Sequence, residues 1–135
     1  MTKLIPPDDF TNDWFGWAKS QTAHIFVGIF LAFALSMVSF VVIGEFPKKT
    51  DMLALIFVGY FLGFKLLLQG WQGWDTIEDV VFVVGYGAAG PLAASMEIEP
   101  GKAAIIMDLE PLLPYFYICV AHLIAGVSWR AYQVK

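Results

Sequence analysis

Charged side chains are scarce in this sequence of 135 residues, and their scarcity indicates its class. Only 15% of the residues are Asp, Glu, Lys or Arg, whereas 59% are hydrophobic. A soluble domain usually carries about a quarter charged residues. A chain this short has too much surface for its volume to hide so much apolar side chain from water as a monomer. We therefore expect a single domain, residues 1–135, that lies in a lipid bilayer.

Other absences exclude whole classes of function. The 8 basic residues against 12 acidic ones give a net charge of −4, so there is no basic surface for nucleic acid. The single cysteine, Cys119, excludes an intrachain disulfide and a cysteine-based metal site. No GxSxG, P-loop or HExxH pattern occurs. We expect no enzymatic activity, no cofactor, no bound metal and no nucleic-acid partner.

Three long apolar runs predict transmembrane helices. The run 23–44 has no charged residue, and at 1.5 Å per residue it reaches about 33 Å, enough for a hydrocarbon core of about 30 Å. The run 52–69 is interrupted only by Lys65, and the third run is 111–129. Tryptophans and cations near the ends of these runs are typical of membrane interfaces. The pattern predicts an all-α integral membrane bundle.

The region 75–96 is ambiguous. Its uncharged part, 80–96, contains Gly85, Gly87, Gly90 and Pro91, which disfavour a continuous helix. We expect three transmembrane helices with 75–96 as an interfacial or re-entrant helix, and a broken fourth span is the alternative. A more polar linker, 97–110, follows it. With either topology, the Lys and Arg distribution favours a cytoplasmic C-terminus in the inner membrane of the cell.

Small residues recur at helical spacing in each predicted span. Such faces let helix backbones approach closely in lipid. Intrachain packing and assembly into a homo-oligomer, or with partners in a membrane complex, account for them equally well. The residues expected at these packing faces are Gly28 and Ala32, Gly59 and Gly63 of a literal GxxxG motif, and Ala121 and Ala125.

A polar stripe is predicted to leave the second span. If the helix continues through Gly70 and Gly73, five of its residues fall within about 40° of one line, with a sixth beside it. Such a stripe lines water between subunits, or it is a polar face that meets bulk water. For Lys65 we expect an amine that reaches the interface, the alternatives being a buried partner carboxylate or a pore-lining role. The stripe consists of Lys65, Gln69, Gln72, Thr76 and Asp79, with Asp75 beside it.

Two histidines lie in or beside the apolar runs. His24 is near the start of the first run and His122 is deep in the third. Imidazole titrates near neutrality, so either residue is a candidate proton relay or pH sensor. The structural alternative is a histidine that hydrogen-bonds to a neighbouring helix or lies in the headgroup region.

The architecture resembles that of small phage holins and holin-like membrane proteins. The resemblance rests on length, the number of spans, the helix-packing glycines and the short charged end with Arg130 and Lys135. It also rests on a second span that ends in a charged, tryptophan-bearing segment, 65–79, followed by VVFVVGYG. The chain lacks the long basic tail of many holins, and its linker 97–110 is unusual. The resemblance implies oligomerisation in the cytoplasmic membrane and a non-specific lesion, with the polar stripe facing the opening.

Two other functions compete with this interpretation. One is a non-catalytic accessory or assembly subunit of a larger membrane complex, whose small and aromatic faces dock on partner helices. The other is a channel or proton-coupled transporter subunit that uses His122, Lys65 and the acidic group near residue 79.

Overall fold

The computed structural model describes residues 10, 13–93, 95–98 and 105–134. In chain order the elements are α1 (Trp14–Ile43), α2 (Lys49–Phe57), the π-helical segment η1 (Val58–Gln69), α3 (Trp74–Val80), the π-helical segment η2 (Val81–Ala88), α4 (Ala89–Ala93), β1 (Ser95–Ile98), β2 (Ile105–Asp108), the short 3-10 segment η3 (Glu110–Leu112) and α5 (Leu113–Gln133). Helical backbone continues from α2 into η1 and from α3 through η2 into α4. The molecule is therefore a bundle of four helical rods joined by two loops and a hairpin.

Three of these rods are long and apolar enough to span a membrane, which confirms the predicted all-α membrane bundle. They are Trp14–Ile43, Lys49–Gln69 and Glu110–Gln133. Their most apolar windows are only 11%, 22% and 6% buried. Exposed apolar surface on this scale is unfavourable in water and normal in lipid. The protein is a membrane-spanning helical bundle.

The first helix begins earlier than the apolar run 23–44 indicated. The side chain of Asp13 accepts a hydrogen bond from the Gly16 N–H at 2.8 Å and so caps α1. The helix ends at Gly44, whose φ of +82° is the left-handed conformation that terminates helices. The extra turns at the start carry Trp17 and Gln21, both of which are buried.

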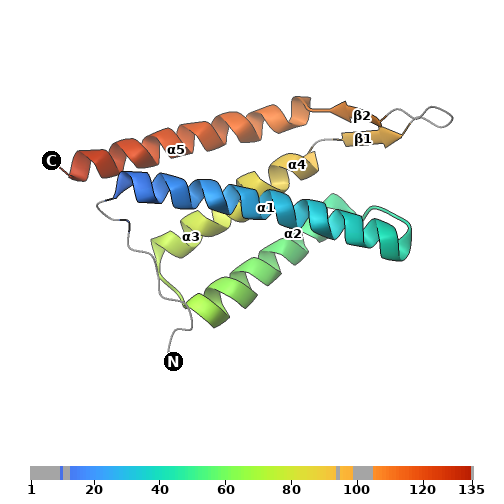
Figure 1. The fold of residues 1–135 in the computed structure, drawn as a ribbon, viewed down its shortest axis with the longest axis horizontal. Helices are drawn as coiled ribbons and strands as arrows, with labels where there is room; N and C mark the ends of the chain where they lie inside the picture. Colours follow the sequence, from blue (N-terminus) through green and yellow to red (C-terminus); the bar gives the residue numbers. More distant parts are fainter. Residues whose placement is uncertain (1–9, 11–12, 94, 99–104, 135) are drawn as a thin grey trace.

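The ambiguous region forms a rod of its own, residues 74–93, the third in chain order, and this rod packs in the middle of the bundle. It contacts α1 most extensively and also α5, α2 and η1 (Figure 1). Phe82, Val83 and Ala88 have no exposed surface at all. The interruption expected at its glycines and Pro91 does not occur, because helical backbone continues through them to Ala93. The helix therefore covers 74–93 and not the expected 75–96, because residues 95 and 96 belong to strand β1, and it lies inside the bundle.

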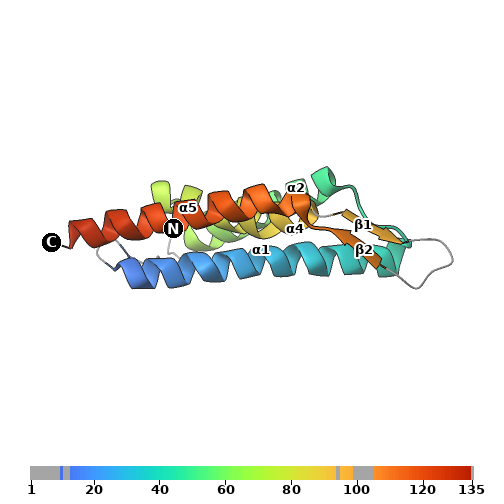
Figure 2. The same ribbon diagram turned by 90° about the horizontal axis from the view of Figure 1, so that it is seen from above.

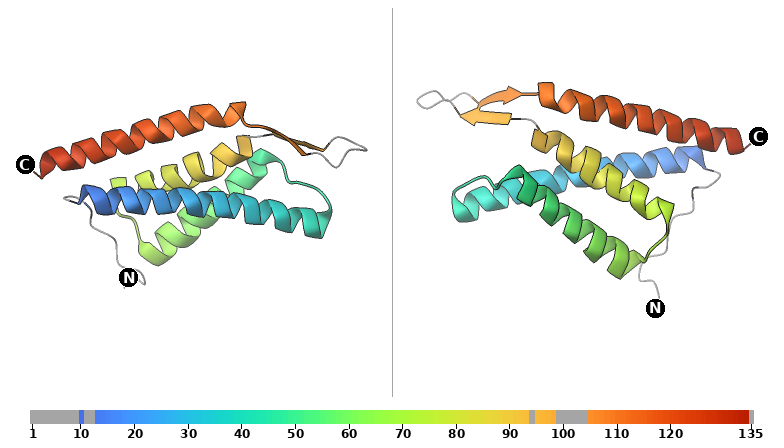
Figure 3. Two further views of the ribbon diagram at one scale, coloured as in Figure 1. Left: turned by 45° about the horizontal axis from the view of Figure 1, so that its top comes forward. Right: turned by 180° about the vertical axis from the view of Figure 1, so that it is seen from behind.

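The four rods alternate in direction along the long axis of the molecule (Figure 1). The start of α1, the end of η1, the start of α3 and the end of α5 lie together at one end, which we call the terminal end. Viewed from above, α5 follows the same long axis as α1 (Figure 2), but the two helices are close near the terminal end and diverge toward the other end (Figures 1 and 3). The rod of α2 and η1 diverges from α1 toward the terminal end (Figures 1 and 3).

Two glycines turn the chain between η1 and α3. Gly70 and Gly73 have φ values of +83° and +69°, which L residues rarely adopt. The condition for a continuous stripe, a helix that continues through Gly70 and Gly73, is therefore not met. Lys65 and Gln69 lie on η1, Gln72 lies in the turn, and Asp75, Thr76 and Asp79 lie on α3.

The linker after α4 contains an antiparallel hairpin that the sequence did not indicate. Ser95 pairs with Asp108 and Ile98 with Ile105 in the register of β1 and β2. Residues 99–104, between the two strands, lie outside the described residues. The hairpin lies at the end of the bundle opposite the terminal end (Figure 1).

Candidate functional site: a buried polar network at the terminal end

Asp79 of α3 is the centre of a buried polar network. Its carboxylate forms an ion pair with the Lys65 ammonium of η1. Gln21 of α1 donates a hydrogen bond from Nε2 to Oδ1 at 3.0 Å. The Nδ1 atom of His24 lies 3.3 Å from the same oxygen. One carboxylate thus joins three of the four helical rods.

Lys65 is 1% exposed, so the expectation that its amine reaches the interface is wrong. The reversal at Gly70 and Gly73 brings Asp79 against the ammonium, and the amine also donates to Gln69 Oε1. A buried ammonium costs several kcal/mol unless it is paired and hydrogen-bonded. The buried partner carboxylate, which we had kept as an alternative, is what the structure contains.

A second carboxylate, Glu78, connects the central rod to α1 and α5. The indole Nε1 of Trp17 donates to Glu78 Oε2 at 3.0 Å, and Arg130 donates to the same oxygen at 3.1 Å. The Arg130 guanidinium also lies 4.3 Å from the Trp17 ring, in cation–π geometry. Glu78, Arg130 and Trp17 therefore come from three different helices, α3, α5 and α1.

The remaining stripe residues have different environments. Thr76 is fully buried, and its hydroxyl accepts a hydrogen bond from the Gln72 N–H at 3.0 Å. Gln69 is buried beside Lys65, whereas Asp75 is exposed in the first turn of α3. Only part of the predicted stripe therefore belongs to the network, and that part faces the interior of the bundle.

Sequence reasoning missed several members of the network. Trp17 and Gln21 are not named in the sequence analysis, and Arg130 appears there only in the short charged end of the chain. The spacing of Trp17, Gln21 and His24, at i, i+4 and i+7, is a signal for one helix face. This face lies mostly before the apolar run 23–44, so the run alone does not reveal it.

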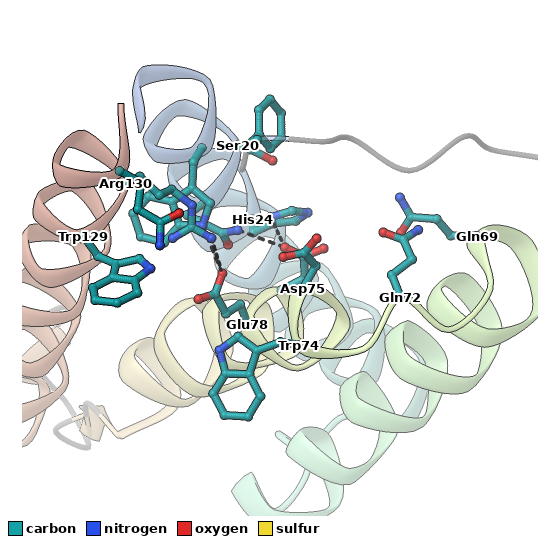
Figure 4. A pocket seen from close by; sticks show the side chains of 14 residues that line it. Ser20, His24, Gln69, Gln72, Trp74, Asp75, Glu78, Trp129 and Arg130 are labelled. Carbon is teal, nitrogen blue, oxygen red and sulfur yellow. Dashed lines mark hydrogen bonds and ion pairs between the residues drawn. The ribbon is translucent and has the colours of Figure 1, made fainter. Parts of the chain in front are cut away.

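A polar cavity of about 400 Å³ opens beside the network. Figure 4 shows side chains from α1, η1, α3 and α5 converging on it, including His24, Gln69, Glu78 and Arg130. Two of the carboxylates beside it have cationic partners, because Lys65 pairs with Asp79 and Arg130 with Glu78. Within the described part of the chain, no cluster of three His, Cys, Asp or Glu side chains could hold a metal ion.

The second predicted histidine forms a separate pair. The hydroxyl of Tyr86 and Nδ1 of His122 are 3.1 Å apart, and the His122 ring packs 4.8 Å from Phe82. His122 is only partly buried on α5. The structure thus brings His24, and not His122, into contact with Asp79.

Of the small residues predicted to pack, those on α1 contact another helix within the chain and those on η1 do not. Gly28 on α1 crosses Gly87 on η2 so closely that a β-carbon on Gly28 would lie 2.7 Å from the Gly87 Cα. Ala32, one turn further, belongs to a buried apolar cluster that includes Ala88. In contrast, a β-carbon on Gly59 or Gly63 would meet nothing within 4 Å.

On α5 the predicted small residues do not pack. Ala121 and Ala125 are exposed. Their neighbour Gly126 makes the contact instead, since a β-carbon there would collide with the Trp17 indole. The small residue of α5 that packs against Trp17 is therefore Gly126, and not Ala121 or Ala125.

No family model, curated protein or solved structure matches this chain. Its own geometry therefore has to supply the functional argument. The network joins four helices through two carboxylates that have cationic partners, and it presents hydrogen-bonding groups to a cavity at one end of the bundle.

Proposed function

We propose that the protein is a non-catalytic subunit of a membrane assembly, which packs against further membrane helices through the face of Gly59 and Gly63. The single observation behind this proposal is that both glycines are uncovered, although the small residues Gly28 and Gly87 are in close contact. In lipid, a small-xxx-small face allows close van der Waals contact with another helix. The partner helix belongs to another copy of the chain or to a different protein.

The pairing of charges supports a subunit over a pore. Lys65 is 1% exposed, and Asp79 is 7% exposed. Their charges are neutralised within one chain, so this part of the stripe has no free polar surface to present to an opening between subunits. A holin-like lesion would require these helices to separate and the ion pair to break.

We also propose that all four rods cross the cytoplasmic membrane, with both chain ends inside. The rod 74–93 has about the length that a hydrocarbon core of about 30 Å requires at 1.5 Å per residue. The alternating directions of the rods bring the start of α1 and the end of α5 to the same end (Figure 1). The acidic residues of the rod 74–93, Glu78 and Asp79, have cationic partners in the bundle, which lowers the cost of placing them in the membrane.

Cysteine labelling tests the topology. In a Cys119→Ser background, we expect Lys19→Cys and Gln133→Cys to be labelled by a membrane-impermeant maleimide only in inverted vesicles. Thr50→Cys should be labelled only from the opposite side. Labelling of positions 19 and 133 from opposite sides would instead show three crossings.

Disulfide crosslinking in native membranes tests the subunit proposal. Cysteines placed along the exposed face of η1 should crosslink to another helix, and Gly63→Leu should reduce that crosslinking several-fold. Ala54→Leu, a small-to-large change at an exposed position of α2, is the matched control. Equal crosslinking yields for Gly63→Leu and Ala54→Leu would contradict the proposal.

The competing functions give different results. Rapid loss of membrane potential when the protein is expressed would support holin-like permeabilisation. A proton flux that His122→Ala or Asp79→Asn abolishes would support a transporter subunit. Stable expression with neither effect is expected of the subunit proposed here.

A further inference from the structure

All five tryptophans of the chain lie at the terminal end of the bundle. Trp14 is the first residue of α1, and Trp17 follows three residues later. Trp71 lies in the turn after η1, Trp74 begins α3, and Trp129 is four residues before the end of α5. These helix ends meet at one end of the molecule (Figure 1). The indoles therefore come from all four rods and gather on one side.

Four of these indoles are exposed and have no internal hydrogen bond. Trp14 is 44% exposed and Trp74 is 71% exposed, with Trp71 and Trp129 between these values. Within the described part of the chain, only Trp17 donates a hydrogen bond from its indole, to Glu78. An exposed indole has an apolar ring and a polar N–H group, so it is most stable where acyl chains meet the oxygens of lipid headgroups.

The polar cavity gives an independent indication of the same level. It lies at the terminal end, and Trp74 and Trp129 line it together with Asp75 and Arg130 (Figure 4). Polar groups that open onto acyl chains lack hydrogen-bond partners, which is unfavourable. In the headgroup layer, water and lipid oxygens supply those partners. The cavity and the indoles beside it therefore favour the same position in the bilayer.

We propose that the terminal end is a face that binds lipid headgroups. The four exposed indoles lie in the headgroup layer of one leaflet, where their N–H groups donate to ester or phosphate oxygens, and the polar cavity opens into this layer. The leaflet is the cytoplasmic one, a point that rests on the topology proposed above. Asp79 is five residues after Trp74, a rise of about 8 Å, against about 15 Å for the hydrocarbon of one leaflet. The ion pair with Lys65 therefore lies about halfway between the headgroups and the bilayer centre.

Quenching of tryptophan fluorescence by brominated lipids tests the proposed depth. The full chain is reconstituted in phosphatidylcholine vesicles whose acyl chains carry bromine either near the ester end or near the methyl end. A background variant has Phe at positions 14, 71, 74 and 129 and keeps Trp17, which binds Glu78. Each exposed tryptophan is then restored singly. We expect every restored indole to be quenched several-fold more strongly by bromine near the ester end.

Phe57→Trp in the same background is the matched control. Phe57 is 42% exposed and lies 12 residues before the end of the helix Lys49–Gln69, a rise of about 18 Å. An indole there should show the opposite preference, for bromine near the methyl end. The wild-type chain, which needs no substitution, should show the preference for the ester end.

Two results would overturn the proposal. One is stronger quenching by bromine near the methyl end, either in the wild-type chain or at any restored position. The other is quenching by aqueous iodide with none by either lipid, because it would place the terminal end in water.

The depth of the indoles is independent of helix association. Gly63→Leu should reduce crosslinking and leave the quenching pattern unchanged, because Gly63 lies on η1 six residues before its end. Deep indoles with intact crosslinking would overturn the headgroup face alone. Maleimide labelling that places both chain ends outside would assign the same shallow indoles to the other leaflet.

Discussion

Lys65 and Asp79 are 14 residues apart in the chain and form an ion pair inside the bundle, where Lys65 is 1% exposed. Both side chains belong to helices that run in opposite directions from the turn at Gly70 and Gly73. The pair explains how two charged residues are accommodated among apolar helices. It also makes the stability of the fold sensitive to the loss of either partner.

Replacing Asp79 by Asn should destabilise the bundle strongly. The substitution keeps the shape of the side chain but leaves the Lys65 ammonium buried without a counter-ion, which typically costs about 3–5 kcal/mol. The free energy of unfolding, measured by SDS titration in mixed micelles, checks this. Glu45→Gln, at an exposed position before α2, should change it by less than about 0.5 kcal/mol.

The double variant Lys65→Met with Asp79→Leu distinguishes a buried pair from two independent residues. Removing both charges relieves the desolvation penalty, so the double variant should be more stable than Asp79→Asn alone. A double variant as unstable as the sum of the single changes Lys65→Met and Asp79→Leu would argue against a direct pair.

Two Gly→Ala substitutions should act in opposite directions. A β-carbon at Gly87 would lie 2.5 Å from the Ile25 carbonyl oxygen and 2.8 Å from the Gly28 Cα. Backbone atoms cannot move aside cheaply, so we expect Gly87→Ala to destabilise the protein by about 1–3 kcal/mol. Gly59→Ala meets open space and should stabilise the helix by about 0.5–1 kcal/mol. The same SDS titration measures both, and equal effects would contradict the crossing of α1 and η2.

Glu78→Gln should loosen the attachment of α5. The amide still accepts a hydrogen bond from Trp17 but no longer carries the charge that pairs with Arg130. Loss of a hydrogen bond between charged groups costs about 1.5–3 kcal/mol. Thermal unfolding in micelles should show this loss, and Glu110→Gln, at an exposed position, is the control. An unchanged unfolding midpoint would show that Arg130 does not hold α5 through this carboxylate.

Tyr86→Phe removes only the hydroxyl of the side chain, and with it the hydrogen bond between Tyr86 and His122. The expected loss of stability is about 0.5–1.5 kcal/mol, the value of an ordinary neutral hydrogen bond. Tyr117→Phe, at a 65% exposed position on the same helix as His122, should have no measurable effect. If the two changes cost the same, the pairing of Tyr86 with His122 contributes no stability.

The spanning helices could be predicted because their signal is local. A long run such as 23–44 without a charge identifies a membrane helix by length and composition alone. The rod 74–93 lacks that signal, since Glu78 and Asp79 lower its apolar character and its glycines favour a break. Its helix is stabilised by packing against the other three rods, which only the tertiary structure reveals.

The candidate site was only partly predictable for the same reason. Lys65 and Asp79 were singled out together, but on one helix face and not across a turn. A literal GxxxG motif drew attention to Gly59 and Gly63, although the closest backbone crossing inside the chain uses Gly28 and Gly87. Spacing in sequence identifies a face of a helix, but it cannot identify what lies against that face.

The ion pair across the Gly70–Gly73 turn bears on how the polypeptide enters the bilayer during synthesis. The helix with Lys65 and the helix with Asp79 would each carry an uncompensated charge into the hydrocarbon if it left the translocon alone. Emerging as a helical hairpin, with the two charges already in contact, avoids this penalty. We therefore expect the second and third helical rods to insert as a single unit, onto which the first and last helices assemble.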